Sequence, residues 1–187
     1  MTYHNINKEN FDCHFNLIYT LEKEDKMIHE VEGDILLTRA QAIAHSVAPN
    51  DDFKKGLAMS LRENFPNLYK DFRHFSHTHH PKEGTLWVWV NAEGKRIFNL
   101  FIQEHAKAHT SHPGAATIPY LNSALKDLRH ILEAEKIGSL ALPKLGTGVG
   151  HLKWDEVKAL IKKHLGDMEI PIYVYSTYQK NQKAEEP

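Results

Sequence analysis

The stretch LPKLGTGVGHLKW, residues 142–154, links a predicted strand to a predicted helix through a glycine-rich segment. Three glycines, Gly146, Gly148 and Gly150, alternate with other residues between an apolar run at residues 139–143 and a helical pattern that follows. Glycine adopts positive φ angles and lets the backbone approach a ligand closely. The stretch is therefore either a tight turn between a strand and a helix or a cradle of backbone N–H groups for a phosphate.

Two familiar phosphate-binding loops do not match this spacing. A P-loop ends in Gly-Lys-Ser or Gly-Lys-Thr, whereas Gly150 is followed by His151. The dinucleotide-binding fingerprint has two residues before its third glycine, whereas only Val149 separates the last two glycines here. On spacing alone, the turn and the phosphate cradle both remain open.

Patterns typical of strands and of helices alternate along most of the chain. Apolar and β-branched runs predict strands at residues 27–31, 41–47, 86–90, 96–102, 137–143 and 170–176. Apolar residues at helical spacing predict helices at residues 56–65, 118–132 and 154–165. Because the two kinds of element alternate, we expect an α/β fold with helices layered on a mixed sheet.

Local signals sharpen two of these elements. Thr117 is suited to cap the N-terminus of the central helix, and Pro119 fits its first turn. Residues 91–94, Asn-Ala-Glu-Gly, separate the third and fourth predicted strands and are typical of a turn. The sequence therefore predicts a hairpin followed by a long amphipathic helix.

The composition is that of one globular domain. The 187 residues, 41% of them hydrophobic, are enough to form a sizeable core. A formal net charge of −1 gives no overall attraction to nucleic acid, and the single cysteine, Cys13, excludes an intrachain disulfide. Neither a signal peptide nor a run long enough to span a bilayer is seen. We therefore expect a cytoplasmic protein that acts as a monomer and does not attach to membranes.

The ends of the chain and a histidine-rich run stand apart from this pattern. We expect residues 27–178 to form the domain, residues 1–26 an N-terminal extension and residues 179–187 a polar, frayed tail. The run from His74 to His80 contains four histidines and is interpreted as a surface connection. Zinc binding there remains an alternative, but no cysteine and no patterned distant ligand support it, so no metal or other cofactor is predicted.

Three segments together resemble the macrodomain family, whose members bind ADP-ribose. They are Glu-Gly-Asp-Ile at residues 32–35, the stretch from His45 to Ala58 that leads into a helix, and the opening stretch. The similarity covers residues 27–178. It is strongest to the terminal ADP-ribose protein glycohydrolases and to antitoxin macrodomains that remove ADP-ribose from DNA. The resemblance implies a three-layer α/β/α fold with a mixed central sheet.

The resemblance also implies a ligand site. Asp34 would accept a hydrogen bond from the adenine amino group, Ile35 would contact the adenine ring, and Tyr175 would lie near it. Lys55, Gly56 and Leu57 would lie near the distal ribose and the diphosphate. The segment that would wrap the diphosphate with backbone N–H groups consists of Gly146, Thr147, Gly148, Val149 and Gly150. Two plainer roles stay open, because Asp34 also suits a helix cap and Tyr175 also suits a core.

The sequence departs from the glycohydrolase branch at the positions that carry its chemistry. That branch has a lysine where Gln103 and Glu104 stand here, and an aspartate at the position of Gly150. Hydrolysis by water is still feasible, because a carboxylate can stabilise positive charge on the sugar while another group acts as a base. We predict Asp51 and Glu104 as catalytic residues.

Other groups remain available for the reaction, and other functions remain open. Asp52 is a further carboxylate, and His105, His112 and His151 are further acid–base candidates. We expect an ADP-ribosyl hydrolase, with a non-catalytic ADP-ribose reader as the alternative. A metal-binding or nucleic-acid-binding module on the same scaffold is the third hypothesis.

Overall fold

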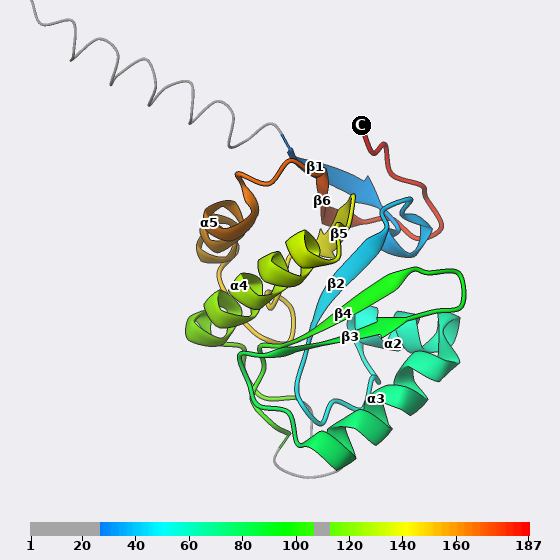
Figure 1. Cartoon of the computed structure of the whole chain (residues 1–187), viewed down its shortest axis with the longest axis vertical. Helices are drawn as coiled ribbons and strands as arrows, with labels where there is room; N and C mark the ends of the chain where they lie inside the picture. The colour runs from blue at the N-terminus through cyan, green and yellow to red at the C-terminus, as the bar shows by residue number, and fades with distance from the viewer. Residues whose placement is uncertain (1–26, 107–112) are drawn as a thin grey trace, which may run out of the picture.

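The computed structural model of the protein describes residues 27–106 and 113–187. The predicted N-terminal extension, residues 1–26, and the candidate His112 lie outside these ranges. Six strands form one sheet in the order β1-β6-β5-β2-β4-β3 (Figure 1). The strands are β1 (Ile28–Gly33), β2 (Ala42–Val47), β3 (Leu86–Val90), β4 (Arg96–Phe101), β5 (Leu140–Pro143) and β6 (Ile172–Tyr178).

The sheet is mixed, as predicted. β1, β6, β5, β2 and β4 run parallel to one another, and only the edge strand β3 is antiparallel to its neighbour. Strands β3 and β4 form the predicted hairpin, since Leu86 pairs with Leu100 and Val90 pairs with Arg96. The parallel strands end at one edge of the sheet, where ligands bind in open α/β folds.

Helices cover both faces of the sheet, which gives the expected three layers. Helices α4 (Ile118–Ala134) and α5 (Trp154–Leu165) pack on one face, and α2 (Gly56–Asn64) and α3 (Pro66–His79) pack on the other (Figure 1). Side chains alternate between the two sides of strand β4: Phe98 joins the α4–α5 core, whereas Phe101 joins the α2–α3 core. A short 3-10 helix, η1 (Ile35–Leu37), follows β1.

The central helix α4 forms for the reasons that the sequence suggests. The Thr117 side chain accepts a hydrogen bond from the Tyr120 N–H group, and Pro119 lies in the first turn. The apolar stripe of this helix is fully buried, because residues three and four apart share one helix face. Its members are Leu121, Leu125, Leu128 and Leu132.

The interpretation of the histidine run as a surface connection is wrong. The run lies on α3, which begins at Pro66 and ends at His79. Proline is tolerated in the first turn of a helix because its missing N–H group would have no partner there. Leu68 and Phe72 are four residues apart and anchor the helix in the core.

The expectation of a frayed C-terminal end is also wrong. The Glu186 side chain is buried, and its carboxylate accepts hydrogen bonds from the Arg39 N–H group at 2.9 Å and from the Thr38 hydroxyl. Further back along the chain, the Gln182 carbonyl accepts a 2.7 Å bond from the Asp34 N–H group. The polar composition of this segment therefore supplies partners for buried polar groups. Among the residues described, no helix combines the length and apolar character needed to cross a membrane.

Candidate functional site

Two adjoining cavities lie beyond the carboxyl ends of the parallel strands. One, here called the Asp34 cavity, has a volume of about 420 Å³ and is lined by residues of η1, α2 and β6. The other, the glycine-loop cavity, has a volume of about 190 Å³ and lies between the loop after β2 and the loop after β5. Gly56, Leu57 and Pro143 line both cavities, so the two form one elongated cleft.

Asp34 is held by the backbone around it. It caps η1, with one carboxylate oxygen accepting from the Leu36 N–H group and the other from the Asn181 N–H group, each at 3.1 Å. The role as a helix cap is therefore confirmed. Each carboxylate oxygen has a second lone pair, so the side chain keeps the capacity to accept from a ligand in the cavity that it lines.

Tyr175 lines the same cavity and is fixed by the C-terminal segment. Its hydroxyl donates a 2.9 Å hydrogen bond to the Glu186 carboxylate. Burial, together with that carboxylate, raises the pKa of Tyr175 and keeps the phenol protonated. The predicted residues Ile35 and Leu57 also line this cavity, with Leu36, Met59, Ser60 and Tyr178.

The sequence-based prediction missed several lining residues of the Asp34 cavity. Met59 and Ser60 lie three and four residues after Gly56 on α2, so helical spacing alone places them on the same side as Gly56. Tyr178 lies at the end of β6 and is 65% exposed, and no pattern in the sequence distinguishes it from an ordinary surface tyrosine.

The glycine-loop cavity faces unpaired backbone donors from two sides. Within the described residues, the N–H groups of Gly148, Val149 and Gly150 donate no hydrogen bond. On the opposite side, the N–H groups of Gly56 and Leu57 lie in the first turn of α2, where a helix leaves its N–H groups without internal partners. This arrangement suits an anion that needs several donors but little net positive charge.

The three glycines of the loop are needed for different structural reasons. A Cβ at Gly150 would lie 2.5 Å from the Gly146 carbonyl oxygen, and a Cβ at Gly146 would lie 2.9 Å from Leu152. Gly146 also has a φ of +66°. Gly148 has no such constraint, because a Cβ there would meet nothing within 4 Å. Packing therefore explains Gly146 and Gly150, whereas the space beside Gly148 is open for a ligand.

Thr147, also predicted as a ligand residue, does not line either cavity. Its hydroxyl and its N–H group both donate to the Lys144 carbonyl, at 2.8 and 3.3 Å. Thr147 thus closes the turn that presents the next three N–H groups.

The two predicted catalytic carboxylates are not brought together. Asp51 lines the glycine-loop cavity, and its carboxylate accepts from the N–H groups of Phe53 at 2.8 Å and Ala48 at 3.4 Å. Burial raises the pKa of Asp51. Glu104 lines neither cavity; its side chain packs against Gly114. The catalytic role of Glu104 stays a prediction without support from the geometry.

Gln103, rather than Glu104, faces the cavity. Its side-chain amide donates to the Gly114 carbonyl at 3.3 Å, and the residue is buried. Successive residues at a strand end point to opposite sides, which explains why only one of the pair reaches the cavity. An amide is not a nucleophile, so this position offers no covalent chemistry. Lysines at the cavity wall come instead from the neighbouring loops, as Lys55 and Lys144.

His45 also lines the glycine-loop cavity and was missed from the sequence. Its Nε2 lies 2.8 Å from the Asn99 side-chain oxygen, while the Asn99 amide donates to two backbone carbonyls. His45 Nε2 therefore carries the proton, and Nδ1 is a buried acceptor without a partner in the described residues. Burial lowers the pKa of His45 to about 4, so the ring is neutral at physiological pH.

The remaining acid–base candidates lie elsewhere. His151 is exposed and lines neither cavity. His105 forms a 2.6 Å contact with Glu83 and lines a separate cavity beside α3. Over residues 27–106 and 113–187, no three His, Cys, Asp or Glu side chains are grouped so that they could hold a metal ion.

Comparisons with known proteins agree with this geometry. No protein-family model matches the chain. A DNA ADP-ribosyl glycohydrolase from Thermus aquaticus is 30% identical over 162 residues, covering 84% of this chain and 43% of the relative. The macrodomain of Thermus aquaticus DarG superposes with a TM-score of 0.71 at 27% identity, covering 80% of this chain and 98% of that structure. Thermosipho africanus DarTG in complex with ADP-ribose gives a TM-score of 0.71 at 25% identity, covering 86% of this chain and 44% of that one.

These similarities confirm the resemblance seen in the sequence, and the chain has the macrodomain fold. The chain spans less than half the length of the DNA ADP-ribosyl glycohydrolases that it matches.

Proposed function

We propose that this macrodomain binds ADP-ribose along the cleft and hydrolyses the bond between ADP-ribose and a macromolecular carrier. The observation that carries the proposal is the pairing of a buried carboxylate, Asp34, at one end of the cleft with unpaired N–H groups at the other. This pairing matches a ligand with an amino-bearing base at one end and a diphosphate further along.

Each part of the ligand has a counterpart in the cleft. Adenine occupies the Asp34 cavity, where the carboxylate accepts from the exocyclic amine and Ile35 and Leu57 contact the ring. The diphosphate lies against the N–H groups of the glycine loop and of the first turn of α2. The distal ribose then lies beside Asp51 and Asp52.

Hydrolysis in this cavity uses water. The bond between the anomeric carbon of the distal ribose and the carrier breaks, the water oxygen bonds to that carbon, and the carrier takes a proton. The sugar passes through an oxocarbenium-like state, whose positive charge a nearby carboxylate stabilises. Asp51 and Asp52 are the carboxylates on the cavity wall, and Asp52 is paired with Lys54 at 3.0 Å.

The carrier that we favour is DNA. Support comes from the similarity to relatives named DNA ADP-ribosyl glycohydrolase, although those proteins are more than twice as long as the matched region. A protein carrier and an ADP-ribose ester are the other substrates to be compared.

A non-catalytic ADP-ribose reader is the second candidate. It is favoured by the state of Asp51, whose two oxygens already accept backbone hydrogen bonds, and by Gln103 at the cavity wall. Both candidates need the same ligand site and differ only in turnover.

One assay separates the two. The protein is incubated with ADP-ribosylated DNA, ADP-ribosylated protein and an ADP-ribose ester, and released ADP-ribose is measured. Release from the DNA substrate that is lost in Asp52→Asn and reduced in Asp51→Asn supports the hydrolase. Binding of ADP-ribose without release from any substrate identifies a reader.

Two broader features belong to the same proposal: action in the cytoplasm and a monomeric state. The single cysteine is compatible with a reducing compartment, which supports the first of these features. Light scattering coupled to size exclusion tests the monomer, for which the expected mass is 21.5 kDa.

A further inference from the structure

A third cavity, here called the α3 cavity, lies between α3 and the loop that follows β2. Its volume is about 290 Å³. Asp51 and Asp52 line both this cavity and the glycine-loop cavity, so the two adjoin at the loop that carries these carboxylates. If the distal ribose lies beside Asp51 and Asp52, the α3 cavity is the next space available to the carrier.

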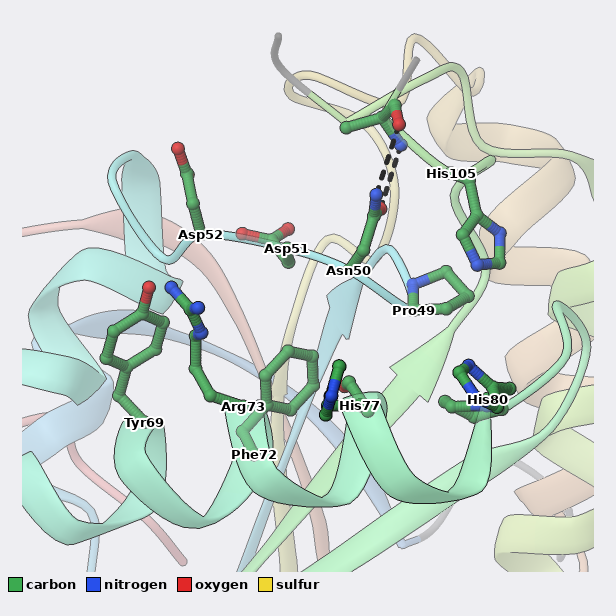
Figure 2. Close-up of a pocket in the computed structure, with 13 residues that line it drawn as sticks. Pro49, Asn50, Asp51, Asp52, Tyr69, Phe72, Arg73, His77, His80 and His105 are labelled. Atoms are coloured by element: carbon green, nitrogen blue, oxygen red, sulfur yellow. Dashed lines mark hydrogen bonds between the residues drawn. The ribbon is translucent and has the colours of Figure 1, made fainter. Parts of the chain in front are cut away.

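The wall of the α3 cavity is rich in groups that bind anions. Figure 2 shows Arg73 and His77 rising from α3 towards the loop with Asp51 and Asp52, and His105 lying across from His80. In the described part of the chain, Arg73 forms no salt bridge with a carboxylate; its guanidinium interacts with the uncharged Tyr69 hydroxyl, which leaves its positive charge for a ligand. Arginine and imidazolium groups make strong, charge-assisted hydrogen bonds to phosphate oxygens.

A buried hydroxyl adds a second and independent indication of a ligand. Ser76 lines the α3 cavity, and its Oγ is buried without a hydrogen-bond partner among the residues described. Buried polar groups almost always have partners, and an exception calls for an explanation. A ligand oxygen in the cavity would supply the missing acceptor.

The two carboxylates at the wall do not oppose an anion strongly. Asp52 is neutralised by Lys54 at 3.0 Å and accepts from the Lys54 N–H group. Asp51 is buried and accepts two backbone hydrogen bonds, and its burial raises its pKa. The positive charge at the cavity therefore comes chiefly from Arg73, while His105 contacts the Glu83 carboxylate at 2.6 Å.

The walls are fixed before any ligand binds. Asn50 makes two hydrogen bonds to the backbone of Ala106, at 2.9 and 3.1 Å, which join the loop after β2 to the segment after β4 (Figure 2). On the opposite side, Phe72 is buried and Tyr69 lies beneath the Arg62 guanidinium at 4.1 Å. Both rings are packed against other side chains, so they stiffen this wall of the cavity.

We propose that the α3 cavity binds a phosphate of the nucleic-acid carrier, with Arg73, His77 and the Ser76 hydroxyl as the contacting groups. This inference rests on the proposed function and names the place where the carrier is held. A local cationic site of this kind is compatible with a chain whose formal net charge is only −1.

The test measures binding of a short fluorescein-labelled single-stranded DNA oligonucleotide by fluorescence anisotropy at several salt concentrations. Arg73→Gln is expected to weaken binding about five- to tenfold and to lower the salt slope by about 1, because one phosphate contact is lost. A second variant, His77→Gln combined with His80→Gln, is expected to weaken binding by a smaller factor, because it alters two further polar side chains of the cavity wall. Lys126→Gln, on the exposed face of α4, removes one charge from the other side of the sheet and serves as the matched control.

ADP-ribose binding by the same variants, measured by calorimetry, keeps the two proposals separate. Unchanged ADP-ribose affinity with weakened oligonucleotide binding is the expected result. Oligonucleotide binding that is absent, or equal in wild type, Arg73→Gln and Lys126→Gln, overturns the inference while leaving ADP-ribose binding intact. Binding of a phosphopeptide that depends on Arg73, without binding of the oligonucleotide, would overturn the assignment to nucleic acid.

Discussion

The two ends of the cleft are built in different ways. At the Asp34 end, a carboxylate and an aromatic side chain are both fixed by distant parts of the chain: Asn181 holds Asp34, and Glu186 holds Tyr175. At the glycine-loop end, the loop contributes several backbone N–H groups that have no hydrogen-bond partner among the residues described. The first end is organised by side chains and the second by main-chain shape.

Because the two ends are built differently, each selects a different part of the ligand. A fixed carboxylate selects a base with an amino group, because an amine supplies the donor that it needs. Unpaired N–H groups bind an anion but do not by themselves cleave a bond. The cleft therefore contains groups that would select a ligand, but fewer groups that would carry out a reaction. Substitutions at one end of the cleft at a time separate the two contributions.

The largest expected effect is the response of the glycine-loop end to acid. His45 is neutral when folded and has a pKa of about 4, against 6.5 in the unfolded chain, so unfolding takes up a proton below pH 6.5. Its contribution to the free energy of unfolding is complete above pH 6.5 and falls by about 3 kcal/mol as the pH drops from 6.5 to 4.

Urea denaturation at a series of pH values measures this contribution. The difference in stability between wild type and His45→Gln should shrink across that pH window, because the variant lacks the titrating group. A difference that stays constant from pH 7 to about 4 would show that burial of the imidazole does not control the acid response.

The next effect concerns the position where the glycohydrolase branch has an aspartate. Gly150→Asp should lower the free energy of unfolding by about 3 kcal/mol, because the new Cβ would clash with the Gly146 carbonyl oxygen 2.5 Å away. Thermal unfolding measures the loss. If the variant instead folds with wild-type stability and gains hydrolase activity, the loop is more adaptable than its packing indicates.

At the Asp34 end of the cleft, removal of the carboxylate acceptor should weaken the binding of ADP-ribose. Asp34→Ala is expected to lower the affinity for ADP-ribose by about 2 kcal/mol, roughly thirtyfold, because a charged hydrogen bond to the base is lost. Asp34→Asn keeps the size of the side chain and one acceptor oxygen for the cap, but its amide group cannot also accept from the second backbone N–H group, so it removes the charge together with one backbone hydrogen bond. Equal affinity of the wild type for ADP-ribose and for its hypoxanthine analogue, which lacks the exocyclic amine, would contradict the role of this carboxylate.

The smallest predicted effect comes from the hydrogen bonds by which the C-terminal segment stabilises the Asp34 end of the cleft. Glu186→Gln should reduce stability by about 1 kcal/mol, since a charged acceptor of two hydroxyl groups and one backbone N–H group becomes neutral. Differential scanning calorimetry measures the change. Lys183→Gln, in the same segment and exposed, is the control and should leave the melting temperature unaltered.

Features set by local pattern were predictable from the sequence, and features set by distant contacts were not. The start of α4 at Thr117 and the hairpin at residues 91–94 follow from local signals and were predicted correctly. The helix α3 was missed because Pro66 resembles a stop signal, although it lies in the first turn. The burial of Glu186 depends on a contact with Thr38, which is 148 residues away in the sequence.

The candidate site divides in the same way. The residues implied at the Asp34 end, Asp34, Ile35 and Tyr175, do line one cavity. Of the two carboxylates predicted for catalysis, only Asp51 reaches the cleft, because the direction of a side chain after a strand depends on where the strand ends. His45 was missed because its position in the site depends on the contact of its Nε2 with Asn99, which leaves Nδ1 without a partner in the described residues. No local sequence pattern reveals that contact.

Calorimetric titration of the wild type and of Gly148→Ala with ADP-ribose tests whether the cleft is an ADP-ribose site. A Cβ at Gly148 meets no protein atom within 4 Å, so the variant should fold normally and the new methyl group should intrude only on the ligand. We expect the wild type to bind one ADP-ribose per chain. We expect Gly148→Ala to bind about tenfold more weakly, because its methyl group keeps the diphosphate from approaching the loop backbone closely. Absence of binding by the wild type, or equal affinity in a well-folded variant, would contradict an ADP-ribose site in the cleft.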